Sequence, residues 1–157
     1  MRPAAFLVVL SLAPALFAPR PGWHVGHGRV HACPGVSASR CVQATSWAAT
    51  IPWRGCRECL PHQTIAALPR DGIALQVTVA RERPLVAKRA LRWPPLLRAR
   101  DVTAGFEGVP RRYGVYQLFA RFGRIEAYVW AFFGRTRPTA EQLAAANAEL
   151  RTVRLRR

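Results

Sequence analysis

Acidic residues and lysine are both scarce in this chain. Among 157 residues, eight are Asp or Glu and 24 are Lys or Arg, which gives a formal net charge of +16. The single lysine is Lys88, so the other 23 cations are arginines. A GC-rich coding sequence produces the same skew, so part of the charge reflects coding bias. Because charge alone supports only non-specific binding, we do not expect a specific nucleic-acid partner.

Sequence motifs of the common enzyme classes are also missing. The chain has no Gly-x-Ser-x-Gly, no P-loop and no His-Glu-x-x-His. Its acidic residues stand singly, without a pair suited to general acid–base catalysis. Half of the residues are hydrophobic, which excludes a disordered polyelectrolyte, and the length suits one domain. The sequence leaves enzymatic activity open but favours a non-enzymatic protein, with no catalytic residue, metal ligand or cofactor assigned.

No apolar run is long enough for a typical membrane-spanning helix. The longest, residues 4–18, follows Arg2 and falls short of the roughly 20 residues that a span needs. Its pattern is typical of a secretory signal peptide, with small residues for cleavage after Ala15. Ala18 is a second candidate, but Pro19 would hinder the peptidase. We expect residues 1–18 to be a signal peptide or, if uncleaved, an N-terminal membrane anchor, and the protein to be secreted or held at the cell envelope.

Neither cysteine nor histidine occurs after residue 62. The segment 23–62 holds all eight of these residues, namely Cys33, Cys41, Cys56, Cys59, His24, His27, His31 and His62. In an exported domain, an even number of cysteines predicts disulfide bonds, here with three alternative pairings. We favour bonds that link Cys33 and Cys41 to the Cys56/Cys59 pair, because closing a longer loop restricts the unfolded chain more.

Metal binding is an alternative interpretation of the same segment. Zinc fingers usually supply two Cys-x2-Cys pairs, and only Cys56 and Cys59 have that spacing. His24 and His27 resemble a metal-binding tract, but the neighbouring glycines predict a flexible stretch. A zinc-binding protein is therefore retained only as an alternative.

A redox centre is the third interpretation. Trp53 precedes Cys56-x-x-Cys59, as a tryptophan does in oxidoreductases of the thioredoxin type, and Arg54 and Arg57 would favour a thiolate. No βαβ pattern surrounds the pair, and Trp53 is not adjacent to Cys56. A thiol–disulfide oxidoreductase that uses Cys56 and Cys59 is thus the alternative function.

The clearest local structure is a β-hairpin. Residues 115–122 and 125–133 are strand-like runs that flank Gly123-Arg124, a pair suited to a type II′ turn. The predicted apolar face pairs Phe122 with Ile125, Ala120 with Ala127, Leu118 with Val129 and Tyr116 with Ala131. The opposite face pairs Arg121 with Glu126, Phe119 with Tyr128 and Gln117 with Trp130. We expect the cysteine-rich segment to cover the aromatic patch of Phe119, Tyr128 and Trp130.

Two further elements flank the hairpin in the sequence. Alternation over residues 73–79 predicts a strand with Ile73, Leu75, Val77 and Val79 inward. Thr139 and Gln142 have the spacing of a capping box, which predicts a helix over residues 140–150. Residues 152–156 fit either a last strand or a longer helix, and the sequence does not decide between them.

A basic, proline-rich region of little periodicity covers residues 81–112. Between residues 81 and 100 it carries seven cations and one acid, a local charge of 7 − 1 = +6. Short edge strands are expected near residues 85–86 and 96–97. The candidate contacts with a polyanion are Arg89, Arg92, Trp93, Arg98, Arg100, Arg111 and Arg112.

The last 30 or so residues carry a weak family resemblance. Residues 129–135, Pro138-Thr139 and residues 142–150 look like the C-terminal strand–helix module of small exported proteins from GC-rich bacteria, and residues 68–72 also look similar. The resemblance implies export and an α+β module, but no activity and no catalytic residue.

These observations predict an α+β protein with a small antiparallel β-sheet and a C-terminal helix packed on one face. A signal or anchor segment (1–18), a disulfide-bonded Cys/His-rich segment (23–62) and an α+β domain (63–157) follow one another. We expect a non-enzymatic binding module of the envelope, whose partner is an anionic envelope polymer or another protein. Membrane contact is expected only through an uncleaved N-terminus.

Overall fold

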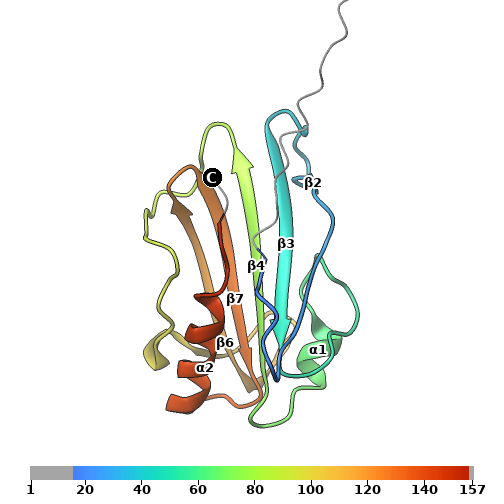
Figure 1. Ribbon diagram of the computed structural model, residues 1–157, viewed down its shortest axis with the longest axis vertical. Helices are drawn as coiled ribbons and strands as arrows, with labels where there is room; N and C mark the ends of the chain where they lie inside the picture. Colours follow the sequence, from blue (N-terminus) through green and yellow to red (C-terminus); the bar gives the residue numbers. More distant parts are fainter. Residues whose placement is uncertain (1–15, 156–157) are drawn as a thin grey trace, which may run out of the picture.

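The computed structural model describes residues 16–155, which form one mostly antiparallel sheet with a helix on each face (Figure 1). In chain order the elements are β1 (His24–His27), β2 (His31–Ala32), β3 (Cys41–Ala49), α1 (His62–Ala66), β4 (Ile73–Glu82), the 3-10 helix η1 (Ala99–Asp101), β5 (Thr103–Phe106), β6 (Val109–Phe122), β7 (Ile125–Phe133) and α2 (Ala140–Leu150). The strand order is β1-β3-β4-β7-β6-β5, and β2 also pairs with β3. The predicted α+β fold, with a C-terminal helix on one face of the sheet, is confirmed.

β6 and β7 form the predicted hairpin in the predicted register. Phe122 pairs with Ile125 next to the turn, and Tyr116 pairs with Ala131 farther along. Gly123 has a φ of +66°, as the first central residue of a type II′ turn requires. No described non-glycine residue has a positive φ. A β-carbon at Gly123 would meet nothing within 4 Å, so backbone conformation and not space selects glycine.

β3 is a central strand that the sequence pattern does not predict. It pairs with β4 along its whole length and with β1 on its other side. Ala44 and Ala48 are fully buried, and Thr45 Oγ1 lies 2.8 Å from Thr78 Oγ1 on β4. Because both faces of this strand are covered, alternation of polar and apolar residues is lost. The Cys/His-rich segment therefore supplies three strands to the sheet.

α2 begins with the predicted capping box. Thr139 Oγ1 accepts a hydrogen bond from the Gln142 amide (3.1 Å), and Gln142 Oε1 accepts one from the Thr139 amide (3.0 Å). The helix ends at Leu150, and Arg154 then forms an isolated antiparallel bridge with Leu16. The end of the described chain is thus neither a sheet strand nor a continuation of the helix.

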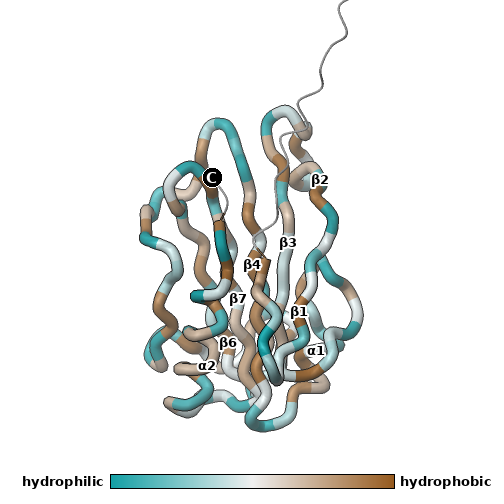
Figure 2. Tube along the Cα trace, viewed as in Figure 1, coloured by the Kyte–Doolittle hydropathy of each residue, from teal (hydrophilic) through white to brown (hydrophobic). Residues whose placement is uncertain are grey.

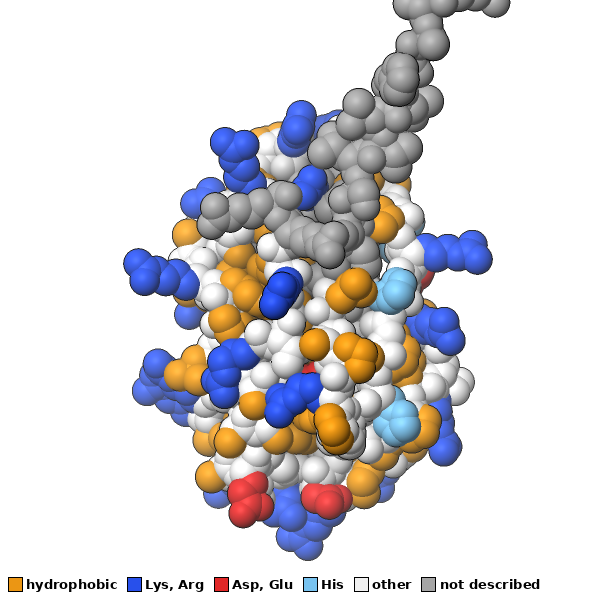
Figure 3. Space-filling model, in the orientation of Figure 1, with side chains coloured by type: hydrophobic (Ala, Val, Ile, Leu, Met, Phe, Trp, Pro, Cys, Tyr) orange, Lys and Arg blue, Asp and Glu red, His pale blue; other side chains and the backbone are white. Residues whose placement is uncertain are grey.

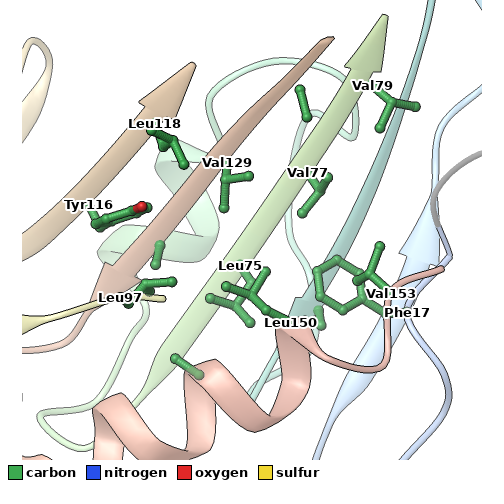
Figure 4. Packing of buried hydrophobic residues seen from close by; sticks show 14 of the residues in the cluster. Phe17, Leu75, Val77, Val79, Leu97, Tyr116, Leu118, Val129, Leu150 and Val153 are labelled. Carbon is green, nitrogen blue, oxygen red and sulfur yellow. The ribbon is translucent and has the colours of Figure 1, made fainter. Parts of the chain in front are cut away.

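The main core lies between the sheet and α2 (Figure 4). The predicted inward residues of β4, Leu75 and Val77 among them, are buried against Leu150. Phe17 belongs to the same cluster, where it lies beside Val153 and is only 5% exposed. Phe17 lies within the segment 1–18 that was expected to be a signal peptide or anchor, so the end of that segment is part of the folded core.

A second cluster occupies the opposite face of the sheet. Ile65 of α1 packs with Phe132 of β7, and Trp53 stacks on Trp47 with ring centroids 4.7 Å apart. Gly26 pairs with Trp47 across β1 and β3. A β-carbon at Gly26 would lie 2.3 Å from the Trp47 ring, so only glycine permits this approach.

The predicted aromatic patch is covered at one end only. Trp130 is half-buried and makes an edge contact with Phe106 (5.1 Å between centroids). It packs against the second cluster, as does Leu60 of the cysteine-rich segment. Phe119 and Tyr128 stack at 4.1 Å, and Tyr128 remains 39% exposed. The cysteine-rich segment thus packs on the same cluster as Trp130, while Phe119 is half-buried and Tyr128 exposed.

The expected edge strands near residues 85–86 and 96–97 are absent from the described chain, so that prediction was wrong. Pro84, Pro94 and Pro95 lack the amide that a strand ladder needs. The segment instead makes one isolated parallel bridge, between Ala90 and Arg121. Figure 2 shows hydrophilic stretches concentrated in such connecting segments and turns.

Candidate functional site

The seven predicted polyanion contacts do not form one site. The six arginines among them are exposed, and Figure 3 shows Lys and Arg side chains projecting around the outline of the visible face. Arg98 and Arg100 flank or lie in η1, whereas Arg111 and Arg112 lie on β6. Arg89 borders β6, where its carbonyl accepts the Arg121 amide (2.8 Å). Only Arg92 and Trp93 meet, in a groove at one end of the sheet.

This groove lies where β4 ends and the β6–β7 hairpin turns, near the end of the chain (Figure 1). Its volume is about 1620 Å³. The residues that line it are Arg81, Glu82, Arg83, Pro84, Leu85, Leu91, Arg92, Trp93, Phe122, Gly123, Arg124, Ile125, Val153, Arg154 and Leu155. Five of these fifteen are arginines and one is a carboxylate, so the groove combines a cationic rim with an apolar floor.

The rim consists of side chains that can reach a ligand. Arg83, Arg92, Arg124 and Arg154 are all exposed, while Arg81 is half-buried and interacts within the protein. Guanidinium groups are weakly hydrated and present planar pairs of donors that match carboxylates and phosphates. The rim is therefore suited to an anion with two acceptor oxygens.

The floor is held rigidly by Trp93. Its indole Nε1 donates to the Val153 carbonyl (2.8 Å), and its ring contacts Phe122 edge-on with centroids 5.1 Å apart. These contacts join the 83–102 segment, the hairpin and the C-terminal segment. The groove is thus held together by contacts of Trp93 with two other segments of the chain.

A buried carboxylate positions the start of the 83–102 segment. Glu126 of β7 is only 1% exposed, and its Oε1 accepts hydrogen bonds from the amides of Val86 and Ala87. The Leu91 amide then donates to the Arg121 carbonyl (2.9 Å). The two bonds to the Glu126 carboxylate are charge-assisted, a type that is among the stronger hydrogen bonds in proteins. Together with the Leu91–Arg121 bond, they fix the path of the segment from β7 to the far edge of β6, and this path determines the position of Arg92.

A side-chain amide fixes the middle of the same segment. Asn147 of α2 accepts from the Leu97 amide (2.8 Å) and donates to the Leu97 carbonyl (3.0 Å). Leu97 is 2% exposed and packs in the main core. The proline-rich segment is therefore pinned at two points by buried side chains of other elements.

Four of the five groove arginines were not among the predicted contacts, and Arg81 in the basic stretch is one of them. Arg83 lies within the basic stretch, Arg124 in the predicted hairpin turn and Arg154 among the C-terminal arginines. The hairpin register could have indicated Arg124, because β7 runs antiparallel to β4 and its first residues meet the end of β4. Arg154 had no such signal, since the path of the chain after α2 was undecided.

A second basic hollow, of about 580 Å³, involves Arg70, Arg112, Arg135 and Arg137. Here two of the four guanidinium groups, those of Arg112 and Arg135, already have protein partners. Arg112 donates to the Tyr113 hydroxyl (2.6 Å) and lies 4.8 Å from the centre of that ring. Arg135 Nε donates to the Arg70 carbonyl (3.3 Å). This hollow is the weaker candidate for an anion.

The expected disulfide pairing was wrong. The bonds are Cys33–Cys41 and Cys56–Cys59, with Cα atoms 5.4 Å and 5.6 Å apart. β3 begins at Cys41, and the Cys59 carbonyl is hydrogen-bonded to Gln76, which pairs with Trp47 six residues farther along the strand, so the two ends lie roughly 20 Å apart. A disulfide requires Cα atoms within about 7 Å, so a bond across that distance is excluded.

The histidines are spread over several elements. His24 and His27 lie on β1, His31 on β2, and His62 opens α1. Within residues 16–155, no group of three or more His, Cys, Asp or Glu residues is arranged to hold a metal ion. His31 lies with its Nε2 3.7 Å from Glu58 Oε2, in an interaction that links β2 to the Cys56–Cys59 loop.

Three titratable groups lie in perturbed environments, and Glu149 and Tyr128 are two of them. Burial raises the pKa of Glu149 above its usual value, and the Arg20 guanidinium, 3.5 Å away, offsets this only in part. Burial also raises the pKa of Tyr128, as do the negative charges of Glu126 and Glu82. Neither group lines the groove, so both perturbations belong to the fold.

Comparisons with protein-family models, with curated proteins and with solved structures give no match for this chain. In the described part of the chain, no helix has the length and apolar character to cross a membrane. The function is therefore argued from the residues and their geometry.

Proposed function

We propose that this protein is an exported, non-enzymatic module that binds an acidic envelope polymer in the groove between the end of β4 and the β6–β7 turn. The observation that carries the proposal is the groove lining, in which five arginines surround an apolar floor and Glu82 is the single carboxylate. The earlier candidates Arg92 and Trp93 belong to it, whereas Arg98, Arg100, Arg111 and Arg112 lie elsewhere.

Both parts of the groove fit a polymer of acidic sugars or acidic repeat units. Paired guanidinium donors bind carboxylate or phosphate oxygens, while the aliphatic stems of the arginines add apolar contact area. The floor of Leu91, Trp93, Phe122 and Val153 suits the less polar face of a repeat unit. An open groove, in contrast to a closed cavity, also leaves room for the chain to continue on either side.

Export is supported by three features. The N-terminal apolar run has the pattern of a signal peptide, and the C-terminal residues resemble a module of small exported proteins. Both cysteine pairs are bonded, and disulfides persist mainly outside the reducing cytosol. An anionic envelope polymer is then a more natural partner than nucleic acid.

The groove favours binding over catalysis. Arginine keeps its proton at any physiological pH and cannot act as a general base. Among the described residues that line the groove there is one carboxylate, Glu82, and no histidine, cysteine, lysine or tyrosine. Such a lining supports recognition of charge and shape.

The test compares two quadruple variants that carry the same net charge. The groove variant is R83Q/R92Q/R124Q/R154Q, and the matched control is R98Q/R100Q/R111Q/R112Q, whose four arginines are exposed outside the groove. Affinity for polygalacturonate, a soluble carboxylate polymer, is measured at two salt concentrations. Four exposed ion pairs at about 0.5 kcal/mol each predict an affinity loss of at least tenfold for the groove variant.

The control should bind nearly as the wild type does, and wild-type binding should weaken with salt. Equal losses in the two variants would show that net charge and not the groove governs binding. If neither the wild type nor the variants bind polygalacturonate, the polymer is rejected. Capture of a protein at the groove would then favour the alternative of a protein partner.

A further inference from the structure

The two disulfide bonds lie in different environments. Cys41 is 3% exposed at the start of β3, and the Cys33 amide donates to its carbonyl (3.2 Å), so this bond clamps the β2–β3 connection. Cys56 and Cys59 are both exposed, on the loop that precedes α1 at the opposite end of the molecule from the groove (Figure 1). Cys41 is buried and Cys33 half-buried, so the Cys56–Cys59 bond is the more accessible of the two to a partner molecule.

The loop around Cys56 is held by a tryptophan. Trp53 stacks on the buried Trp47 with centroids 4.7 Å apart, and its indole Nε1 donates to the Cys56 carbonyl (3.0 Å). These contacts fix the backbone next to Cys56 whether or not its sulfur is bonded to Cys59.

Side chains of α1 and β4 hold both ends of the same loop. Thr64 Oγ1 accepts from the Arg54 amide (2.7 Å) and donates to the Arg54 carbonyl (2.9 Å). Gln76, which is 3% exposed, donates to the Cys59 carbonyl (3.0 Å). Because a bond between residues three apart removes little entropy from the unfolded chain, the Cys56–Cys59 bond adds little to this framework.

The surroundings of the Cys56 sulfur favour negative charge. The Cys59 amide lies 3.0 Å from Cys56 Sγ and donates to it, and the exposed Arg54 and Arg57 belong to the same loop. Glu58 opposes them, but its Oε1 accepts the Arg29 amide (2.8 Å) and its Oε2 faces His31. Stabilisation of the Cys56 thiolate favours the reduced form of the pair, and this makes the Cys56–Cys59 disulfide a stronger oxidant.

We propose that Cys56–Cys59 is an exchangeable disulfide that oxidises paired thiols of an exported protein. A thiolate of the partner attacks Cys56 Sγ, the Cys56–Cys59 bond breaks, and Cys59 leaves as a thiolate that takes up a proton. The second thiolate of the partner then attacks the partner's sulfur in the mixed disulfide, and the Cys56 thiolate is released. Two electrons pass from the partner dithiol to this protein, and one disulfide is exchanged for another.

The experiment mixes oxidised wild-type protein with a reduced peptide that contains two cysteines, without any other oxidant. Peptide disulfide is quantified by mass spectrometry, and alkylation mapping reports which protein cysteines become reduced. We expect stoichiometric peptide oxidation, with alkylation at Cys56 and Cys59 and an intact Cys33–Cys41 bond. The C56S/C59S variant, which retains Cys33–Cys41 as its internal control, should not oxidise the peptide.

Thermal unfolding of C56S/C59S keeps the test interpretable. A melting temperature close to the wild type, together with loss of peptide oxidation, supports exchange at this site. A wild-type protein that leaves the peptide reduced, or simultaneous reduction of both bonds, would overturn the proposal. So would a C56S/C59S variant that unfolds, because the bond would then be structural. None of these outcomes depends on binding in the arginine groove.

Discussion

Glu149 is a carboxylate with an unusual position at the last turn of α2. Its side chain is fully buried, and the Arg20 guanidinium lies 3.5 Å from Oε2, while neither oxygen accepts a hydrogen bond within the described chain. Desolvation of an ionised carboxylate is costly, and for this reason the pKa of Glu149 is raised. The folded state therefore binds the Glu149 proton more tightly than the unfolded chain does.

This position predicts a pH dependence of stability. A raised pKa in the folded state gives stability that is present below the unfolded pKa, about 4.3 for glutamate, and is lost as pH rises through the folded pKa. The variant E149Q should remove that loss, so its advantage over wild type should grow with pH. Chemical denaturation of both proteins from pH 4 to 8 measures the difference. Parallel curves would contradict the assignment.

Under the proposed export, Phe17 distinguishes between the two cleavage sites expected from the sequence. Its side chain is 5% exposed in the main core, and the next amide, that of Ala18, donates to Thr152 Oγ1 (3.2 Å). Cleavage after Ala18 would remove Phe17, whereas cleavage after Ala15 retains it. N-terminal sequencing of the exported protein should therefore begin at Leu16.

The cost of losing Phe17 can be measured separately. F17A should destabilise the protein by about 3 kcal/mol, the lower part of the range for a core phenylalanine. L16A is the matched control, because Leu16 is 42% exposed, and it should have little effect. A mature N-terminus at Pro19 with unchanged stability would refute this role for Phe17.

At the scale of elements, Asn147 links α2 to the proline-rich segment. N147A would leave the buried amide and carbonyl of Leu97 without their partner. Two such losses predict a destabilisation of about 3 kcal/mol. E141A, an exposed change on the same helix, is the control. If the two variants unfold at the same denaturant concentration, the Asn147 contacts do not stabilise the segment.

The elements that the sequence predicts are those that local chemistry determines. The hairpin follows from Gly123 and alternating residues, and α2 from the Thr139–Gln142 capping box. β3 escapes prediction because strands on both sides and layers on both faces bury it. The 83–102 segment is placed by Glu126 and Asn147, whose partners lie some 40 to 50 residues away in the sequence.

The candidate site was only partly predictable for the same reason. Arg92 and Trp93 were identified from local charge and aromatic content, and both line the groove. Arg83, Arg124 and Arg154 come from three separate segments that meet only in the fold. The disulfide pairing depended on the extent of β3, which no local pattern indicates.

At the scale of the whole molecule, the arginines behind the net charge of +16 fall into two groups. Most of the described arginines are exposed outside the groove, where each contributes little to a specific interaction. At the end of β4 the fold gathers five of them around an apolar floor. The account therefore assigns binding to this groove and treats the remaining charge as a general attraction to anionic surroundings.

The measurement that tests this assignment most directly is the NMR signal of the Trp93 indole N–H during titration with polygalacturonate. Trp93 is the one tryptophan among the residues that line the groove, and its indole bonds to Val153. The signal is assigned by its loss in W93F. The account predicts a saturable shift of the Trp93 signal, with the signals of Trp23, Trp47, Trp53 and Trp130 nearly unchanged. Saturable binding that leaves Trp93 unshifted, or that shifts another tryptophan instead, would contradict it.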